Sequence, residues 1–170
     1  MQGQSLEQAT IRNATTADAA SIADIYNHYV TNTVVTFEEE PVSPAEMAGR
    51  IEEVTSASLP WLVAERGGRV LGYAYASQWK GRAAYRFTKE ITVYVGQRAV
   101  GHGLGSRLYT ALFPILADRG IHTVLGGIAL PNPASVALHE RFGLAKVAHL
   151  KEVGFKFGQW IDVGYWQRTL

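Results

Sequence analysis

A glycine-rich loop that joins a predicted strand to a predicted helix is the clearest chemical signal in this sequence. Its glycines are Gly96, Gly101, Gly103 and Gly105, and Ser106 follows at the expected start of the helix. Glycine has no Cβ, so the backbone can approach a ligand closely, and the free N–H groups at a helix N-terminus favour an anion. The loop therefore predicts a cradle for a phosphate or pyrophosphate, with a plain strand-to-helix turn as the alternative.

The spacing of these glycines fits neither of two common nucleotide-binding loops. Gly96 and Gly101 have the separation of a Walker A loop, but no lysine follows Gly101. The run Gly101-x-Gly103-x-Gly105 differs from the G-x-G-x-x-G fingerprint of dinucleotide-binding domains. The loop is therefore neither a Walker A loop for ATP nor a dinucleotide-binding loop for NAD.

Composition excludes several further chemistries. The 170 residues contain no cysteine, so disulfides, thiolate zinc sites and a cysteine nucleophile are impossible. The histidines show no metal-ligand spacing, and no Gly-x-Ser-x-Gly elbow for a serine hydrolase exists. A formal net charge of +1 gives no support for a nucleic-acid partner. We expect a cytoplasmic protein without a signal peptide or membrane segment, since residues 1–9 are polar and the apolar stretch 109–117 is short.

Hydrophobic periodicity and turn residues predict the strands and helices that hold the loop. The clearest helix starts are the capping box that begins at Ser43, and Asn132 followed by Pro133; Thr16 is expected to cap an earlier helix. The expected strands cover residues 10–13, 61–64, 70–78, 86–95, 123–129, 146–153 and 161–168, and the expected helices cover 16–29, 43–57, 106–118 and 132–142. This order predicts one α/β domain over residues 10–170, after a tail over 1–9, with helices on both faces of a mixed sheet.

Two segments resemble the signatures of the GNAT acetyltransferase superfamily. Gly103-Leu104-Gly105 takes the Gly-x-Gly place of the acyl-CoA loop, and Val100 stands where the family has Gln or Arg. Residues 132–144 (NPASVALHERFGL) are similar to the second signature, Asn-x-x-Ala/Ser-x-x-Leu-Tyr-x-x-x-Gly-Phe. The resemblance implies the GNAT fold, whose mixed sheet is mostly antiparallel, and acetyl-CoA as the co-substrate.

Other segments resemble one subgroup, the phosphinothricin and methionine sulfone/sulfoximine N-acetyltransferases. They include Glu90-x-x-Val93-Tyr94-Val95 and residues 154–164 (GFKFGQWIDVG). The subgroup acetylates the α-amine of small amino-acid analogues and forms homodimers. The resemblance thus implies an N-acetyltransferase that works by direct attack in a ternary complex, and a homodimer. The alternatives are a GNAT enzyme for a polyamine, an aminoglycoside or a protein N-terminus, a non-catalytic acyl-CoA sensor, and a nucleotide-binding protein.

The resemblance also implies where the co-substrate lies. Strands 90–95 and 123–129 are expected to splay apart, with acyl-CoA in the opening and a main-chain N–H polarising the thioester carbonyl. The expected contacts of acyl-CoA are Val93, Tyr94, Val95, Arg98, Gly101, His102, Gly103, Leu104, Gly105, Ser106, Asn132 and Ser135.

Two residues are candidates for proton transfer. Glu90 is expected to be the general base, because the attacking amine is an ammonium at neutral pH; a salt bridge to Arg86 or Lys89 is the alternative. His139 stands where many superfamily members have a tyrosine that protonates the leaving thiolate. A contact with CoA, or simple packing on a helix face, are the alternatives for His139.

Basic residues before the Glu90 strand are candidates for binding the acidic end of the substrate. An arginine fork at Arg82 or Arg86 would suit a carboxylate or a phosphinate. The full set of expected substrate contacts is Lys80, Gly81, Arg82, Arg86, Glu90, Ile91 and Thr92, and no metal ligand is expected.

Overall fold

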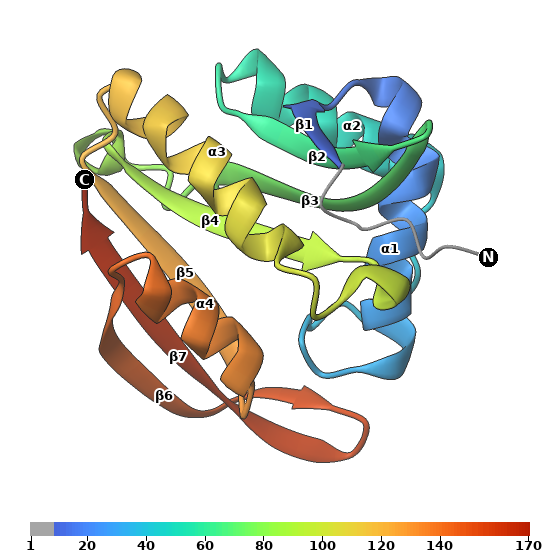
Figure 1. The fold of residues 1–170 in the computed structure, drawn as a ribbon. Coiled ribbons are helices and arrows are strands. Elements are labelled where there is room, and N and C mark those ends of the chain that lie inside the picture. Colours follow the sequence, from blue (N-terminus) through green and yellow to red (C-terminus); the bar gives the residue numbers. More distant parts are fainter. Residues whose placement is uncertain (1–8) are drawn as a thin grey trace.

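The structure, a computed structural model, describes residues 9–170 and is built on one seven-stranded sheet (Figure 1). The elements follow the predicted order along the chain. The strands are β1 (Thr10–Asn13), β2 (Trp61–Arg66), β3 (Arg69–Gln78), β4 (Thr88–Val95), β5 (Thr123–Leu130), β6 (Ala145–Lys156) and β7 (Gln159–Thr169), and the helices are α1 (Ala19–Asn32), α2 (Pro44–Ser56), α3 (Leu104–Asp118) and α4 (Pro133–Arg141).

Residues 1–8 of the expected tail lie outside the described residues. Ala9, the last residue of that tail, is buried in the core beside α3. No helix within residues 9–170 is long and apolar enough to cross a membrane.

The sheet has the order β1-β2-β3-β4-β5-β7-β6. Every neighbouring pair is antiparallel except β4 and β5, which are parallel. Their parallel ladder is short, and it ends at the pair Glu90 and Leu125. Beyond this pair β4 continues against β3 alone, and β5 continues against β7 alone. The two halves of the sheet therefore part in the middle, as the sequence analysis expected.

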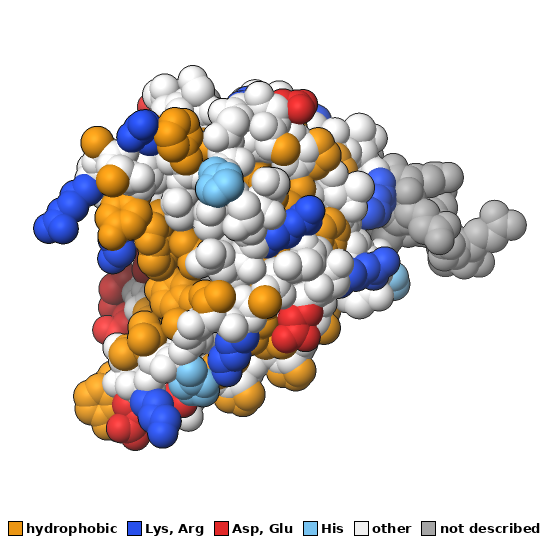
Figure 2. All heavy atoms as spheres, turned by 90° about the vertical axis from the view of Figure 1, so that its left-hand side faces the viewer, with side chains coloured by type: hydrophobic (Ala, Val, Ile, Leu, Met, Phe, Trp, Pro, Cys, Tyr) orange, Lys and Arg blue, Asp and Glu red, His pale blue; other side chains and the backbone are white. Residues whose placement is uncertain are grey.

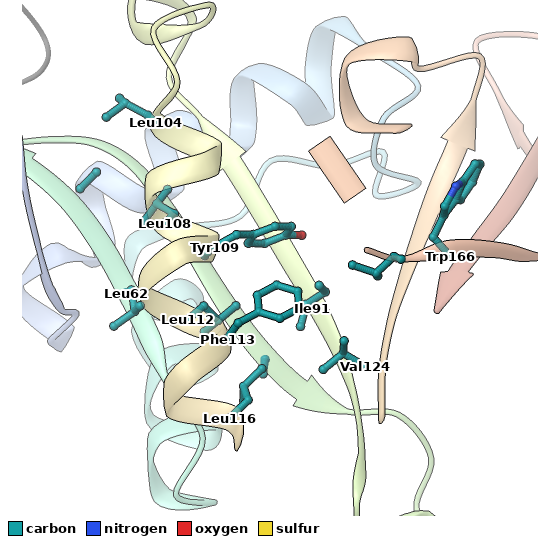
Figure 3. Packing of buried hydrophobic residues seen from close by; sticks show 14 of the residues in the cluster. Leu62, Ile91, Leu104, Leu108, Tyr109, Leu112, Phe113, Leu116, Val124 and Trp166 are labelled. Atoms are coloured by element: carbon teal, nitrogen blue, oxygen red, sulfur yellow. The ribbon is translucent and has the colours of Figure 1, made fainter. Parts of the chain in front are cut away.

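Helices cover both faces of the sheet, which confirms that part of the predicted fold. Because side chains alternate along a strand, neighbouring residues of β2 enter different cores. Leu62 packs in the core under α3, whereas Val63 packs in the core under α1 and α2. Figure 3 shows the α3 core, in which a row of leucines from Leu104 to Leu116 points from the helix toward the sheet.

The predicted helix caps are present at two of three helices. Ser43 Oγ accepts the N–H of Glu46 at 3.2 Å, and the Glu46 carboxylate accepts the N–H of Ser43 at 2.8 Å. Asn132 Oδ1 accepts the N–H of Ser135 at 3.1 Å, which caps α4. Both caps are local hydrogen bonds within four residues, which explains why the sequence reveals them.

The prediction that Thr16 caps the first helix is wrong. A short 3₁₀ turn, Thr16–Asp18, precedes α1, and Thr15 is the residue before it. The Asp18 carboxylate accepts the Thr15 N–H at 2.8 Å and also pairs with Arg12 at 2.7 Å. This ion pair with β1 fixes the turn, so α1 begins at Ala19.

Two strands differ from the predicted ranges in ways that affect the site. The expected strand at residue 86 begins only at Thr88, because Ala83–Tyr85 form a 3₁₀ turn. Strand β6 continues to Lys156 instead of ending at residue 153. It does so through two irregularities in its pairing with β7, the second between Leu150 and Gly154. Bulges of this kind leave no simple alternating pattern in the sequence.

Candidate active site

The parting of β4 and β5 opens a cavity of about 330 Å³ at the centre of the sheet. Glu90 enters it from the last residue pair of the parallel ladder. Opposite it on β5 stands Gly127, where a Cβ would lie 3.3 Å from Glu90 Oε1 and 3.0 Å from the Tyr165 ring. The absence of a side chain at Gly127 therefore leaves room for the Glu90 carboxyl group.

The environment of Glu90 favours a carboxyl group that takes up a proton more readily than an exposed one. Burial raises the pKa of the Glu90 carboxyl above its usual value, and the positive charge of Lys80 offsets part of this shift. The salt-bridge alternative finds no support, because the Lys89 ammonium donates to the Arg86 carbonyl oxygen at 2.9 Å. The Arg86 guanidinium lies over the Phe87 ring, 4.5 Å from its centre. A carboxylate with a raised pKa is a better base for an ammonium than an exposed one.

His139 lies on the same cavity, packed against β5 at Gly126. A Cβ on Gly126 would lie 2.4 Å from His139 Nε2, so only glycine permits this position of the ring. His139 is 4% exposed, and burial lowers the pKa of its imidazole. The histidine is therefore a buried neutral group at the cavity rather than a surface residue of α4.

The hydrogen bonds of His139 identify its tautomer. Nδ1 lies 2.8 Å from the Ser135 carbonyl oxygen, which only accepts, so Nδ1 carries the proton. In the neutral ring Nε2 is then an acceptor, and it lies 3.1 Å from the hydroxyl of Tyr109. Tyr109 therefore donates to His139 in the neutral pair. The phenol of Tyr109 belongs to the fully buried core and also lines the cavity.

A second hollow, of about 870 Å³, continues from the cavity along the free edge of β4 to the glycine-rich loop. Beyond Glu90, β4 has β3 on one side only, so main-chain groups on its other edge face this groove. The groove is lined by all but one of the residues predicted to contact acyl-CoA: Val93, Tyr94, Val95, Arg98, Gly101, Gly103, Leu104, Gly105, Ser106, Asn132 and Ser135. His102 is the exception; it is exposed and does not line the groove.

The loop has the geometry of an anion cradle. Gly101 and Gly103 have φ of 84° and 72°, which glycine adopts without strain. Gly103 is the N-cap of α3, so the N–H groups of the first helical turn have no acceptor within the helix. At Gly105 a Cβ would lie 3.0 Å from the Leu138 side chain, so glycine here lets α4 approach the start of α3. A pyrophosphate fits this end of the groove, and a chain with amide groups fits the β4 edge.

The structure brings only part of the predicted substrate set to the cavity. Ile91 and Thr92 line it together with Glu90. Lys80, Gly81, Arg82 and Arg86 lie on the exposed segment before β4 and do not line it. Among these four, Lys80 is the one whose charge acts on Glu90, and its ammonium lies 5.2 Å from the centre of the Trp79 ring.

Sequence reasoning missed one wall of the cavity. The segment between α1 and α2 contributes Thr36, Phe37 and Glu38 to the lining, and Arg50 of α2 holds Glu38 with two hydrogen bonds of 2.6 and 3.0 Å. Tyr109 was also missed. None of these residues stands in a motif, since their partners are distant in the chain. The only local signal for this wall was the aromatic residue Phe37 beside a run of glutamates.

Within residues 9–170, no group of three or more His, Asp or Glu side chains could hold a metal ion. The site therefore consists of a carboxylate, a Tyr–His pair, a bare strand edge and an anion cradle. A family model described as the acetyltransferase (GNAT) domain matches residues 11–164. The chain belongs to the GNAT acetyltransferases.

Relatives place the chain in the predicted subgroup. It is 47% identical over 158 residues to the phosphinothricin N-acetyltransferase of Streptomyces viridochromogenes, covering 93% of this chain and 86% of that one. It is 36% identical to the L-methionine sulfoximine/L-methionine sulfone acetyltransferase of Salmonella typhimurium, covering 95% and 94%. The family, the subgroup and the enzyme class predicted from the sequence are confirmed.

The fold agrees with a solved structure of the subgroup. A GNAT superfamily phosphinothricin acetyltransferase from Sinorhizobium meliloti, in complex with acetyl-CoA, superposes with a TM-score of 0.92 at 40% identity. The match covers 95% of this chain and 88% of that one. The predicted GNAT fold is confirmed.

The hydrogen bonds of His139 make a prediction that NMR can check. We expect the imidazole to stay neutral at pH 6.5 with its proton on Nδ1, because burial lowers its pKa and Ser135 accepts from Nδ1. Two-dimensional ¹⁵N–¹H spectra of the ring distinguish the two tautomers from imidazolium. Free histidine in the same buffer serves as the reference. A His139 ring that is protonated at pH 6.5, or protonated on Nε2, would contradict the assignment.

Proposed function

We propose that this enzyme transfers the acetyl group of acetyl-CoA to the α-amine of a small amino-acid analogue of the phosphinothricin, methionine sulfone or methionine sulfoximine type. The observation that carries the proposal is the position of Glu90, where β4 and β5 part and the groove to the glycine-rich loop begins. The names of the relatives support the substrate class.

The reaction that fits this geometry is a direct attack in a ternary complex. Glu90 takes a proton from the ammonium, directly or through water, and the amine then attacks the thioester carbonyl carbon. The C–N bond forms, the nitrogen gives up its second proton to water, the C–S bond breaks, and the CoA thiolate leaves. A main-chain N–H on the free edge of β4 polarises the carbonyl oxygen. The absence of cysteine excludes a cysteinyl acyl-enzyme.

The proton for the leaving thiolate is assigned to Tyr109 and His139 acting together. In the neutral pair the hydroxyl proton of Tyr109 lies on the hydrogen bond to Nε2, so His139 has no proton of its own to offer the cavity. In this proposal the Tyr109 O–H bond breaks as the S–H bond of CoA forms, and the tyrosinate then regains a proton from water. His139 orients the hydroxyl before transfer, which gives it a positioning role in place of the acid role considered from the sequence.

The acidic end of the substrate is assigned to the basic segment before β4. Lys80 acts on Glu90 electrostatically, so an anionic group bound beside Lys80 would bring an α-amine near the Glu90 carboxylate. Arg82 and Arg86 lie on the same segment and stay proposed contacts.

The first test measures release of CoA thiol from acetyl-CoA over a panel of amines, with a thiol-reactive dye. We expect turnover with phosphinothricin, methionine sulfone and methionine sulfoximine, and little with spermidine, an aminoglycoside or a peptide. The protein contains no cysteine and adds no thiol background. Turnover with only one of the other amines would contradict the proposed substrate class and assign the enzyme to that amine. Acetyl-CoA binding without turnover on any amine would favour a sensor instead.

Replacing Glu90 by glutamine tests the general base. We expect Glu90→Gln to lower kcat/KM at pH 7 by roughly 100-fold or more, because the amine then has no group to take its proton. The defect should shrink at high pH, where more of the amine is already neutral. Initial rates from pH 6 to 10 measure the loss of kcat/KM and its dependence on pH. A variant whose pH–rate profile equals that of the wild type would show that Glu90 is not the general base.

Stability of the same variant checks that it folds. Since burial raises the pKa of Glu90, its carboxylate is disfavoured in the folded state, and this contribution to stability falls as pH rises through that pKa. The Tm of Glu90→Gln relative to the wild type should therefore be higher at pH 8 than at pH 4. Loss of activity with a Tm that is low at both values would indicate misfolding instead.

We also propose that two copies of the chain pair through the hairpin of β6 and β7. Large apolar side chains of this hairpin are exposed, with Trp160 at 63% and Phe157 at 59%. Figure 2, which looks at the left-hand side of Figure 1, shows hydrophobic side chains gathered along a hollow of the surface. An exposed apolar set of this size on an edge hairpin is typical of a buried interface. Its other members are Val147, Leu150, Val153 and Phe155.

Light scattering tests this pairing. We expect a mass about twice the 18.6 kDa of one chain, and a monomer for Trp160→Glu, because a carboxylate would be desolvated in the interface. The control Arg141→Glu puts the same new carboxylate on the exposed side of α4 and should remain dimeric. A monomeric wild type, or a Trp160→Glu variant that stays dimeric, would exclude this interface.

A further inference from the structure

Lys156, at the end of β6, is almost completely buried although its side chain is ionisable. The residue is 1% exposed, and burial lowers the pKa of its ammonium while the charges of Glu39 and Glu38 oppose that shift. An ammonium removed from water is costly unless its protons are bonded. The burial of Lys156 therefore depends on the hydrogen-bond acceptors that surround its ammonium group.

The ammonium of Lys156 joins two backbone oxygens far away in the chain. Nζ donates to the Val30 carbonyl oxygen at 2.7 Å and to the Thr36 carbonyl oxygen at 2.8 Å. Val30 lies in the last turn of α1, where carbonyl groups have no partner within the helix and favour a positive charge. Thr36 lies in the segment that follows. Lys156 thus links the β6–β7 hairpin to the connection between α1 and α2, which lie together at the bottom of Figure 1.

The same connection touches the hairpin at a second point. A Cβ on Gly154 would lie 2.3 Å from Cζ of Phe37, so the Phe37 ring occupies the space that glycine leaves. Gly154 and Lys156 point to the same side of β6, two residues apart. The hairpin therefore contacts two neighbouring residues of the connection. Lys156 bonds the backbone carbonyl of Thr36, and Gly154 packs against the ring of Phe37.

These contacts set a wall of the amine cavity. Thr36, Phe37 and Glu38 line the cavity that holds Glu90. The Thr36 hydroxyl bonds the Tyr26 hydroxyl of α1 at 2.7 Å, and Arg50 of α2 holds Glu38. The wall is thus fixed from three elements, and Lys156 and Gly154 are the contribution of the hairpin.

We propose that Lys156 and Gly154 are positioning residues that place the segment around Thr36 and Phe37 and so determine how the enzyme binds its amine substrate. The inference rests on the proposed acetyl transfer, but it concerns residues that touch neither acetyl-CoA nor the reacting atoms. It makes the β6–β7 hairpin, distant in sequence, part of the acceptor site. The acyl-CoA groove is lined by none of the hairpin residues.

The test compares Lys156→Met with Lys151→Met. Methionine keeps much of the length and volume of lysine and loses the donors, and Lys151 is an exposed lysine of the same hairpin. We expect the KM of the amine to rise by about 10- to 100-fold in Lys156→Met, because the wall is displaced while Glu90 is not. The KM of acetyl-CoA should stay within about twofold of the wild type, and Lys151→Met should match the wild type in every constant. Light scattering on both variants checks that the oligomeric state is unchanged.

Hydrogen exchange provides a readout that does not need turnover. Amides of residues 33–43 should exchange faster in Lys156→Met than in Lys151→Met, while amides of α3 exchange alike. If the wild type turns over none of the panel amines, the proposed function has failed, and this exchange difference still tests the positioning role. Equal exchange in residues 33–43 together with an unchanged amine KM would overturn the inference.

A second variant covers the case in which Lys156→Met does not fold. Gly154→Ala keeps the Lys156 side chain and displaces the Phe37 ring, which has room to move because the residue is 40% exposed. We expect a changed amine KM and an unchanged acetyl-CoA KM. A Gly154→Ala variant with wild-type constants for every amine of the panel would overturn the role of the hairpin in acceptor binding.

Discussion

The parting of β4 and β5 is the feature on which the rest of this structure depends. The two strands share a ladder only up to Glu90 and Leu125, and each then continues with a single neighbour. A strand edge inside a protein leaves main-chain N–H and C=O groups that need partners. Acyl-CoA, whose arm carries amide groups, can take the place of the missing strand along β4. In the proposed function the groove binds through the backbone, so the departure at Val100 from the family pattern leaves the glycines and the helix N-terminus of the cradle in place.

A pair of adjacent glycines opens the gap on both faces of the sheet. Successive residues of a strand point to opposite faces, so Gly126 leaves room on the side of α4 and Gly127 leaves room on the side of α1 and α2. His139 occupies the first space, and the Glu90 carboxyl lies over the second. The two groups proposed for proton transfer therefore reach the same cavity from opposite faces of the sheet.

The sequence predicts those parts of the structure that short segments determine. The capping box at Ser43, the Asn132 cap and the glycine loop are set by residues within a few positions of one another, and each is present. The groove that we propose for acyl-CoA follows for the same reason, because β4, the loop and α3 are consecutive. Thr16 was misjudged because the ion pair of Asp18 with Arg12 comes from another element. The 3₁₀ turn at Ala83–Tyr85 and the bulged end of β6 depend on tertiary contacts in the same way.

The proposed amine site is built from parts of the chain that lie farther apart than those of the proposed acyl-CoA groove. Its wall joins Thr36 to Tyr26 of α1, Glu38 to Arg50 of α2, and the backbone of Thr36 to Lys156 of β6. No single segment contains it, so no motif identifies it. On this proposal, a change at any of these contacts reshapes the acceptor cavity and leaves in place the strand edge and the cradle proposed for the acyl donor. Acetyl transfer and choice of amine then belong to separable parts of one sheet, with the choice set by the contact between the hairpin and the connection between α1 and α2.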